Sequence, residues 1–596
     1  MVIDGDLNLD FGDTLDFQIA GNAAGAEYDQ FVVNGTVSIN DSFLKLQDFY
    51  NPLEGDQFIL MRNDGADSID GEFFLEGTLT RLTEGYEFTD FLGVTGQSAY
   101  LTYKGGDGND LAIVVEDSTP QVSLPVNGES DHYTLKVVGD HVILSDDVTG
   151  DVIYNTPLSA LGGPLVIDGE PDQDDTLTID LTGIDDSTPL QVVFNGGTGG
   201  NDALNLTGGD LVTMNYYFDN VSDGRIALNT PMNEFLTYTG LEPITSTVDS
   251  ENVVLYYGDT SETISITNAG GGMTTVDSTA GEMLTFIDPT DVLLLNAGGG
   301  DDIINIDSLA ANYSGELRIV GGDDDDILNV NTSLSLSADK YLLLTAEDIN
   351  LNGGSITTNG YVWQSYYGDV TLGADTVINN TGGEGIYFDF TVNGSHSLDV
   401  TSDGFVVFYD DVTINELTVN AGTVAGQLSG SINTGSGDVE MTAGENIAIT
   451  NITTTGEVRL TAMTGAIADN SADKSSNINA DRAVLRAGTD IGGYTDDTLE
   501  TSVNTLAASV ANGNIEIVNT GALEIGTVDS LDGVTANNGN VIITTASPLT
   551  VNQTISGDSV TLTTVDSAAA GDNLTINADI TSTVSDITLN SGDDFT

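Results

Sequence analysis

The strongest constraint on the fold is a pair of neighbouring segments that align with each other without a gap. The segments are LLLNAGGGDDIINID (Leu293 to Asp307) and LRIVGGDDDDILNVN (Leu317 to Asn331). Each contains a short apolar strand, a Gly/Asp turn and a second short strand. Strands this short cannot bury their apolar faces alone, so a unit that recurs at this period is best explained by stacking on its neighbours. The repeat therefore predicts an all-β chain folded as a parallel β-helix (solenoid), with room for short side hairpins and loops.

The same alignment places acidic residues on acidic residues. Asp301 falls on Asp325 and Asp302 falls on Asp326. In stacked coils these carboxylates would lie at about the 4.8 Å spacing of paired strands. Carboxylates that close repel one another unless a positive charge or a proton lies between them.

Weaker copies of the unit extend the pattern in both directions. In a second alignment Asp168 falls on Asn195 and Asp175 on Asp202, and LYYGDTSETISIT (Leu255 to Thr267) is a less acidic copy. From residue 336 the acidic turns fade, and coils of variable length follow, as in Val439 to Val458 and Val560 to Ile587. The one segment that suggests a short helix is SVNTLAASVAN (Ser502 to Asn512).

The charge balance restricts the partners. The 596 residues include 93 acidic and 12 basic side chains, for a net charge of −81, and no cysteine. Nucleic acids and anionic membranes are themselves polyanions and are therefore not expected as partners, whereas cations are. No apolar run is long enough for a membrane span, and no secretory signal opens the chain, so we expect a segment cut from a longer polypeptide.

Two parts of the chain resemble families of exported bacterial proteins. YDQFVVNGTVSIN (Tyr28 to Asn40), GDQFILMRNDGADSIDGEF (Gly55 to Phe73) and YLTYKGGDGNDLAIVV (Tyr100 to Val115) are similar to the closing coils of autotransporter passenger domains. The coils after residue 336 resemble the repeats of filamentous-haemagglutinin-like adhesins. Both resemblances imply a right-handed parallel β-helix on an extracellular or cell-surface protein. We divide the chain accordingly into an autotransporter-like segment (1–118), a segment with acidic turns (119–335) and a haemagglutinin-like segment (336–596).

The acidic turns also resemble the GGxGxD half-site of hemolysin-type repeats, which implies bound Ca²⁺. These turns are GGDGND (Gly105 to Asp110), GTGGND (Gly197 to Asp202), AGGGDD (Ala297 to Asp302) and GGDDDD (Gly321 to Asp326). Oxygen-only ligation suits this hard cation. The tandem nonapeptides of that family are missing, so stacking of coils would have to replace them, and the alternative is that Gly and Asp only form tight turns. The candidate metal ligands are Asp107, Asp110, Asp175, Asp202, Asp301, Asp302, Asp323, Asp324, Asp325 and Asp326.

No arrangement of residues typical of a catalytic site stands out, so the chain is predicted to be a structural or adhesive element rather than an enzyme. The alternative is a polysaccharide lyase or glycoside hydrolase on the same fold, with Arg459 or Arg486 as the base of a lyase; charge compensation is the simpler explanation of these arginines. Aromatic residues concentrate between 361 and 409, either as a core stack or as an exposed platform for sugars or a partner protein. A string of calcium-linked β-sandwiches would need a repeat of about 100 residues, which the alignments do not show.

The expected partners follow from this interpretation. They are neighbouring copies or the rest of a longer chain, joined end to end, and surface glycans or host cell-surface proteins. Neither nucleic acid binding nor membrane insertion of this segment is expected.

Overall fold

The computed structural model describes residues 1–596 except positions 49, 51, 53–55, 64–66, 79, 90, 94–97, 107, 116–120, 125–129, 162, 185–187, 189, 231–233, 472–473, 493–497 and 568–570. Over the described residues the chain is all-β, and its helical structure consists of short 3-10 turns, such as Leu158–Ala160. The chain divides into two compact units, residues 1–173 with 187–198 and residues 174–186 with 199–596. The predicted three-part division of the sequence stays a prediction.

The first sheet of unit 1 combines parallel and antiparallel strands. β1 (Val2–Ile3) pairs in parallel with β4 (Phe31–Val33), which pairs in parallel with β7 (Gln57–Asn63). β12 (Asp110–Val115), β11 (Ala99–Gly105) and β10 (Glu87–Phe88) follow in that order as antiparallel strands. The predicted fold allowed short side hairpins, and β11 with β12 is one of them. The turn between the two strands is too short for a parallel crossover, which needs a dozen or more residues.

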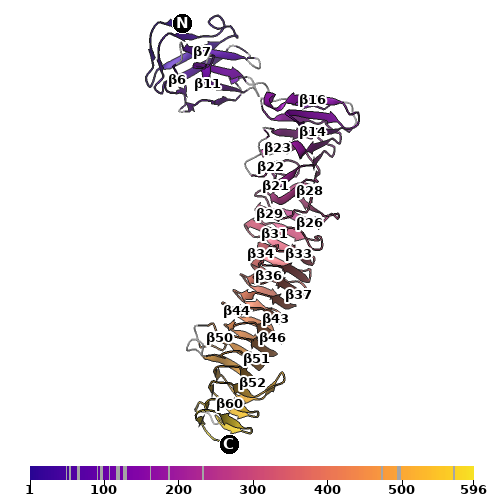
Figure 1. Ribbon diagram of the computed structural model, residues 1–596, viewed down its shortest axis with the longest axis vertical. Helices are drawn as coiled ribbons and strands as arrows, with labels where there is room; N and C mark the ends of the chain where they lie inside the picture. Colours follow the sequence, from indigo (N-terminus) through magenta and orange to yellow (C-terminus); the bar gives the residue numbers. More distant parts are fainter. Residues whose placement is uncertain are drawn as a thin grey trace. The chain divides into compact units, whose positions relative to one another are not determined.

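Unit 2 is built from coils whose strands pair with their counterparts in the next coil (Figure 1). In the clearest coils three strands alternate with three corners. β43 (Glu416–Ala421), β44 (Ala425–Gln427) and β45 (Ile432–Gly435) pair in parallel with β46 (Val439–Ala443), β47 (Ile447–Ile449) and β48 (Ile452–Thr454), in that order. A strand that pairs this way is buried on one face by the interior of its own coil, and its alternate residues face outward.

The register confirms the sequence repeat. In β29 (Val292–Gly299) and β31 (Glu316–Asp323), Leu293 pairs with Leu317 and Leu295 pairs with Ile319. β30 (Ile303–Ile306) and β32 (Ile327–Val330) pair at the same offset. The predicted alignments farther along are also confirmed, because Val439 pairs with Val458 and Val560 with Ile587.

Some coils are lengthened by antiparallel hairpins. β26 (Thr263–Asn268), β27 (Met273–Ser278) and β28 (Gly281–Ile287) are successive antiparallel neighbours. The insertion explains why the coil that joins Leu255 to its partner Leu295 is much longer than the next one, in which Leu295 pairs with Ile319. β26 also pairs in parallel with β30, and β28 with β24 (Ile244–Ser246), so the lengthened coil stays joined to its neighbours.

The predicted helix at Ser502 to Asn512 is wrong. Residues 502–510 belong to β52 (Leu499–Val510), which pairs in parallel with β51 (Ile478–Ala487) on one side. On the other side this part of β52 pairs in parallel with β54 (Leu523–Ile525) and β57 (Val534–Ala536). Ladder hydrogen bonds from both neighbouring coils outweigh a local helical preference, which is worth less than about 1 kcal/mol per residue.

Candidate functional site

The acidic turns stack at one corner of the coils in unit 2. Gly298 precedes Asp301 and Asp302, and Gly322 precedes Asp325 and Asp326 one coil later. Gly322 has a φ of +129°, and a Cβ at this position would meet the carbonyl oxygen of Gly298 at 2.0 Å. Only glycine allows the two turns to approach this closely. The glycines therefore bring the carboxylates into register.

The inner carboxylates of this corner form a hydrogen-bonded ladder, which we call the carboxylate ladder. The backbone N–H of Glu262 donates to Oδ1 of Asp302 (2.9 Å), and the N–H of Asp302 donates to Oδ1 of Asp326 (3.0 Å). The N–H of Asp326 in turn donates to Oε2 of Glu347 (2.9 Å). Asp302, Asp326 and Glu347 thus each accept a bond from the acidic residue of the preceding coil.

The outer acidic residues of the same turns face solvent. Asp301, Asp323, Asp324 and Asp325 are exposed. Oδ1 of Asp301 accepts the N–H of Asp325 (3.3 Å), and Oδ2 of Asp324 accepts the N–H of Gly300 (3.3 Å). Stacking therefore brings all six predicted acidic residues of the two turns to one corner, but only Asp302 and Asp326 lie in the interior.

Burial makes the carboxylate ladder difficult to ionise. Burial raises the pKa of Asp302 to about 6. The hydrogen bond from the N–H of Glu262 opposes this rise, and the charge of Asp326 adds to it. Burial also raises the pKa of Asp326. The pKa of Glu262 rises to about 8, first through burial and then through the charge of Asp302. Close to neutral pH the ladder therefore holds protons, or else it needs a cation.

The second carboxylate oxygens of the ladder show what a cation could contact. Within the described part of the chain no donor reaches Oδ2 of Asp302, Oδ2 of Asp326 or either side-chain oxygen of Glu262, and all three residues are buried. These hard oxygens suit calcium in chemistry. No group of three or more acidic or histidine side chains is placed to hold one metal ion, as far as the described side chains show.

The other predicted ligands lie in similar turns. The N–H of Asp175 donates to Oδ1 of Asp202 (2.8 Å), which confirms their predicted alignment, and burial raises the pKa of Asp202 to about 6. Asp110, in unit 1, accepts the N–H of Asn63 (2.8 Å). Asp107 lies outside the described residues.

Two members of the ladder were missed from sequence. Glu262 belongs to the less acidic copy at Leu255 to Thr267, and the pairing of Leu255 with Leu295 extends in register to place Glu262 on Asp302. Glu347 follows the last acidic turn by one coil. The signal was the register itself, which could be extended to glutamates as well as aspartates.

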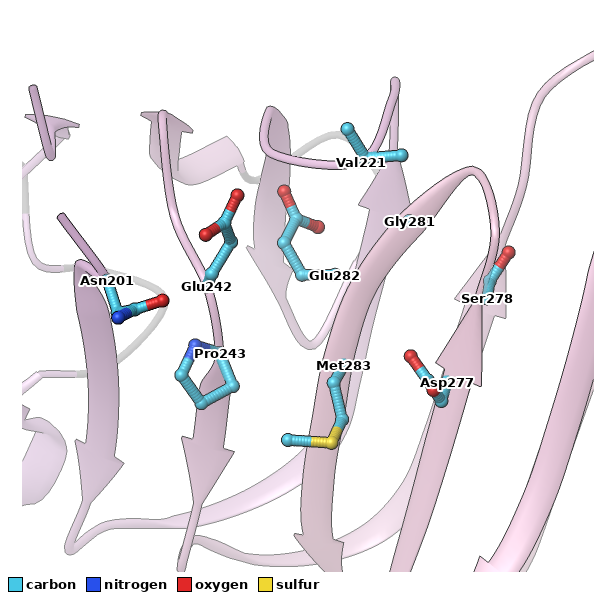
Figure 2. Close-up of a pocket in the computed structure, with 9 residues that line it drawn as sticks. All are labelled: Asn201, Val221, Glu242, Pro243, Asp277, Ser278, Gly281, Glu282 and Met283. Atoms are coloured by element: carbon cyan, nitrogen blue, oxygen red, sulfur yellow. The ribbon is translucent and has the colours of Figure 1, made fainter. Parts of the chain in front are cut away.

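A separate cavity of about 370 Å³ lies beside the antiparallel hairpins of unit 2. Figure 2 shows the carboxylates of Glu242 and Glu282 pointing toward the same side of this cavity, with Asp277 and Met283 nearby. Oε2 of Glu282 accepts the hydroxyl of Tyr238 (3.0 Å), and burial raises the pKa of Glu282 to about 7. A buried acid of this kind beside a second carboxylate has the groups that glycoside hydrolysis uses.

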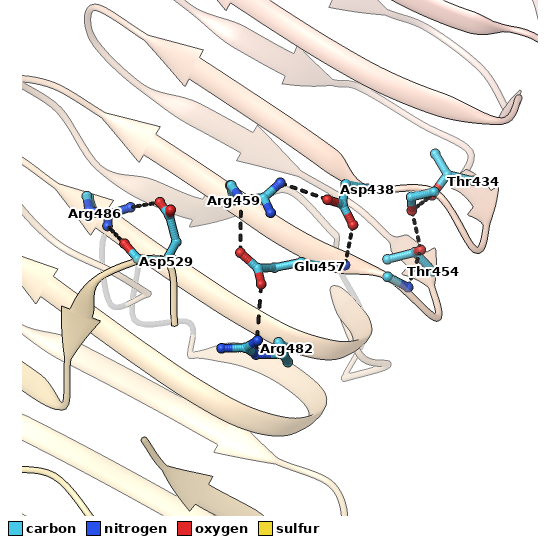
Figure 3. Close-up of polar contacts among 10 residues, drawn as sticks. Thr434, Asp438, Thr454, Glu457, Arg459, Arg482, Arg486 and Asp529 are labelled. Carbon is cyan, nitrogen blue, oxygen red and sulfur yellow. Dashed lines mark hydrogen bonds and ion pairs between the residues drawn. The ribbon is translucent and has the colours of Figure 1, made fainter. Parts of the chain in front are cut away.

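The arginines considered as lyase bases are engaged in ion pairs (Figure 3). Arg459 contacts Asp438 (2.9 Å) and Glu457 (2.9 Å), and Arg486 contacts Asp529 (3.3 Å). Two carboxylates on one guanidinium match the charge-compensation explanation. A guanidinium is already protonated, and neighbouring carboxylates keep it so, which means that it must lose a proton before it can act as a base.

The aromatic residues between 361 and 409 divide between the interior and the surface. Tyr366, Phe388 and Phe408 are fully buried and stack on three successive coils, with ring centroids 4.9 and 5.0 Å apart. Tyr361, Trp363, Tyr367, Phe390 and Tyr409 are exposed. Both predicted alternatives are therefore present, a core stack and a surface row.

A scan of protein-family models and a search of curated proteins found no match to this chain. Among the described residues no helix has the length and apolar character needed to cross a membrane.

Proposed function

We propose that the chain is a rigid, acidic structural or adhesive segment of a large exported bacterial surface or filament protein. Its coils would close into a right-handed parallel β-helix, because parallel crossovers are right-handed in nearly all proteins. The observation that carries the proposal is the unbroken register of coil on coil, since a solenoid of this kind derives its function from length, rigidity and surface chemistry. Antibodies against this chain should label intact cells of the bacterium that makes it. Labelling only after permeabilisation would refute the surface location.

The proposed contacts are end to end, with further coils of a longer chain or with neighbouring copies. Surface glycans and host proteins are the proposed adhesive partners.

Calcium at the carboxylate ladder is the proposed stabilising cation. We expect a chelator at low salt to lower the melting temperature and added calcium to restore it, because a ligand present at 100 times its Kd stabilises the folded state by about 2.7 kcal/mol. Asp302→Asn with Asp326→Asn should remove most of this response, since the amide keeps the accepted hydrogen bond but loses the charge.

Asp67→Asn with Asp70→Asn is the matched control, because both residues are exposed and lie outside the ladder. A melting temperature that does not respond to the chelator would show that no cation is bound at the ladder.

The second candidate function is polysaccharide cleavage, favoured by the cavity with Glu242 and Glu282. A hydrolase should release reducing ends from a polysaccharide, and Glu282→Gln should abolish the release because the amide cannot donate a proton. A lyase would instead produce unsaturated products that absorb ultraviolet light, from acidic polysaccharides with calcium present. If neither product forms on a panel of neutral and acidic polysaccharides, the structural proposal is favoured.

A further inference from the structure

Five aromatic residues of unit 2 share one outer face. Ser365 of β36 (Gln364–Leu372) pairs with Tyr387 of β38 (Gly385–Phe388), and Tyr387 pairs with Val407 of β41 (Phe405–Phe408). Residues two positions apart on a strand point to the same side. We call the set on this side the aromatic face, and it consists of Trp363, Tyr367, Tyr387, Phe405 and Tyr409.

Tyr387 lies at the centre of the aromatic face. Its ring centroid is 5.8 Å from Trp363, 4.6 Å from Phe405 and 6.3 Å from Tyr409. Phe405 leans over Gly385, where an added Cβ would meet its ring at 2.1 Å. Trp363 and Tyr409 are 46% and 37% exposed. The rings thus form a continuous surface that their own coils do not cover.

Negative charge surrounds this surface. Oε2 of Glu384 accepts the indole N–H of Trp363 (2.6 Å), and the charges of Glu384 and Asp389 act on the hydroxyl of Tyr387. Residues 341 to 458 contain no lysine or arginine. In the preceding coils, Lys340 donates to the carbonyl of Thr290 (2.7 Å) and Arg318 pairs with Glu316.

The same molecule shows how such rings are covered when a cation is available. Tyr217 and Tyr256 stack at 4.7 Å on successive coils, and the guanidinium of Arg225 lies 4.2 Å from the centre of the Tyr217 ring. Arg225 also contacts the carboxylate of Glu234 (3.4 Å). Arg81 repeats the arrangement in unit 1, over Phe74 and beside Asp41.

We propose that the aromatic face binds an extended, arginine-bearing segment of a partner protein. The aromatic face supplies stacked rings and nearby carboxylates, and these are the two kinds of group that hold Arg225. Only the guanidinium is missing. Arginine fits better than lysine because its planar group stacks on rings while its N–H groups reach a carboxylate. A neutral glycan could stack on the same rings but would gain nothing from the surrounding negative charge.

This inference does not depend on the proposed surface location or on calcium. It requires only the described coils and their charge. A failure of cell-surface labelling or of the calcium response would therefore leave it standing.

The test uses the whole chain and an eight-residue peptide of alternating arginine and serine, at 150 mM salt. Trp363 is the only tryptophan, so its fluorescence reports binding at the face itself. We expect saturable binding of this peptide and at least tenfold weaker binding of a peptide in which neutral citrulline replaces arginine. Tyr387→Leu with Tyr409→Leu should weaken binding of the arginine peptide about tenfold, because two cation–π contacts are removed while the charge is kept. Phe595→Leu, at an exposed aromatic outside the face, should change nothing.

Melting temperatures check that the variants are folded, and Tyr409→Leu alone replaces the double variant if the latter is destabilised. Equal binding by wild type and aromatic variants would mean that net charge alone attracts the peptide and would overturn the proposal. A response of Trp363 to cellohexaose, with none to the arginine peptide, would overturn it in favour of a glycan site.

Discussion

Glu262→Gln is expected to raise the melting temperature at pH 8.5 in the presence of a chelator and to leave it nearly unchanged at pH 5. Glu262 is buried in the carboxylate ladder, and its pKa is raised to about 8 by burial and by Asp302. An acid with a raised pKa in the folded state contributes its full stability below its ordinary pKa and loses it as the pH rises through the raised value. At about 1.4 kcal/mol per pKa unit, ionisation of Glu262 costs on the order of 5 kcal/mol, which glutamine avoids.

Thermal unfolding at pH 5, 7 and 8.5 measures this difference. The wild-type melting temperature should fall over the range, since Asp302, with its pKa near 6, shifts in the same direction. Glu251→Gln is the matched control, because Glu251 is exposed and lies outside the ladder. Parallel pH profiles for wild type and Glu262→Gln would contradict the buried position of this carboxyl group.

Phe388→Ala is expected to cost about 3–5 kcal/mol of unfolding free energy. The ring is fully buried between Tyr366 and Phe408, nearly parallel to both, at interplanar angles of 8° and 7°. Its removal leaves a cavity that two neighbouring coils share. Urea unfolding measures the loss, and hydrogen exchange should show it concentrated in β36, β38 and β41.

Phe390→Ala is the control for this prediction. Phe390 lies two residues farther along and is 49% exposed, so its truncation should cost less than about 1 kcal/mol. An equal cost at both positions would contradict the division of the aromatic residues into a core stack and a surface row.

Much of the architecture was predicted from local pattern. The alignment of the two acidic segments predicted the pairing of Leu293 with Leu317, and the weaker copy predicted that of Asp175 with Asp202. Register can be read this way because strand residues alternate between two faces, so a slip of one residue would expose the whole apolar set. The lengths of the coils from Val439 to Val458 and from Val560 to Ile587 could be predicted for the same reason.

Other features could not be read locally. The sequence at Ser502 to Asn512 has helical spacing, yet the ladders of two neighbouring coils make it a strand as far as Val510. The sequence also left open where the side hairpins form, and the antiparallel pairing of β11 with β12 places one of them in the first segment. In both cases the partner strand, rather than the segment's own preference, decides the outcome.

The sequence by itself determined which residues lie on which in successive coils, because that depends only on period and alternation. Only the tertiary structure decided that Asp302 and Asp326 are buried while Asp301 and Asp325 face water, and that Glu262 joins them from an earlier, hairpin-lengthened coil. It also placed Tyr366 inside and Tyr367 outside. Burial, and with it the charge state of a carboxyl group, depends on neighbours supplied by other coils, and no local pattern specifies those neighbours.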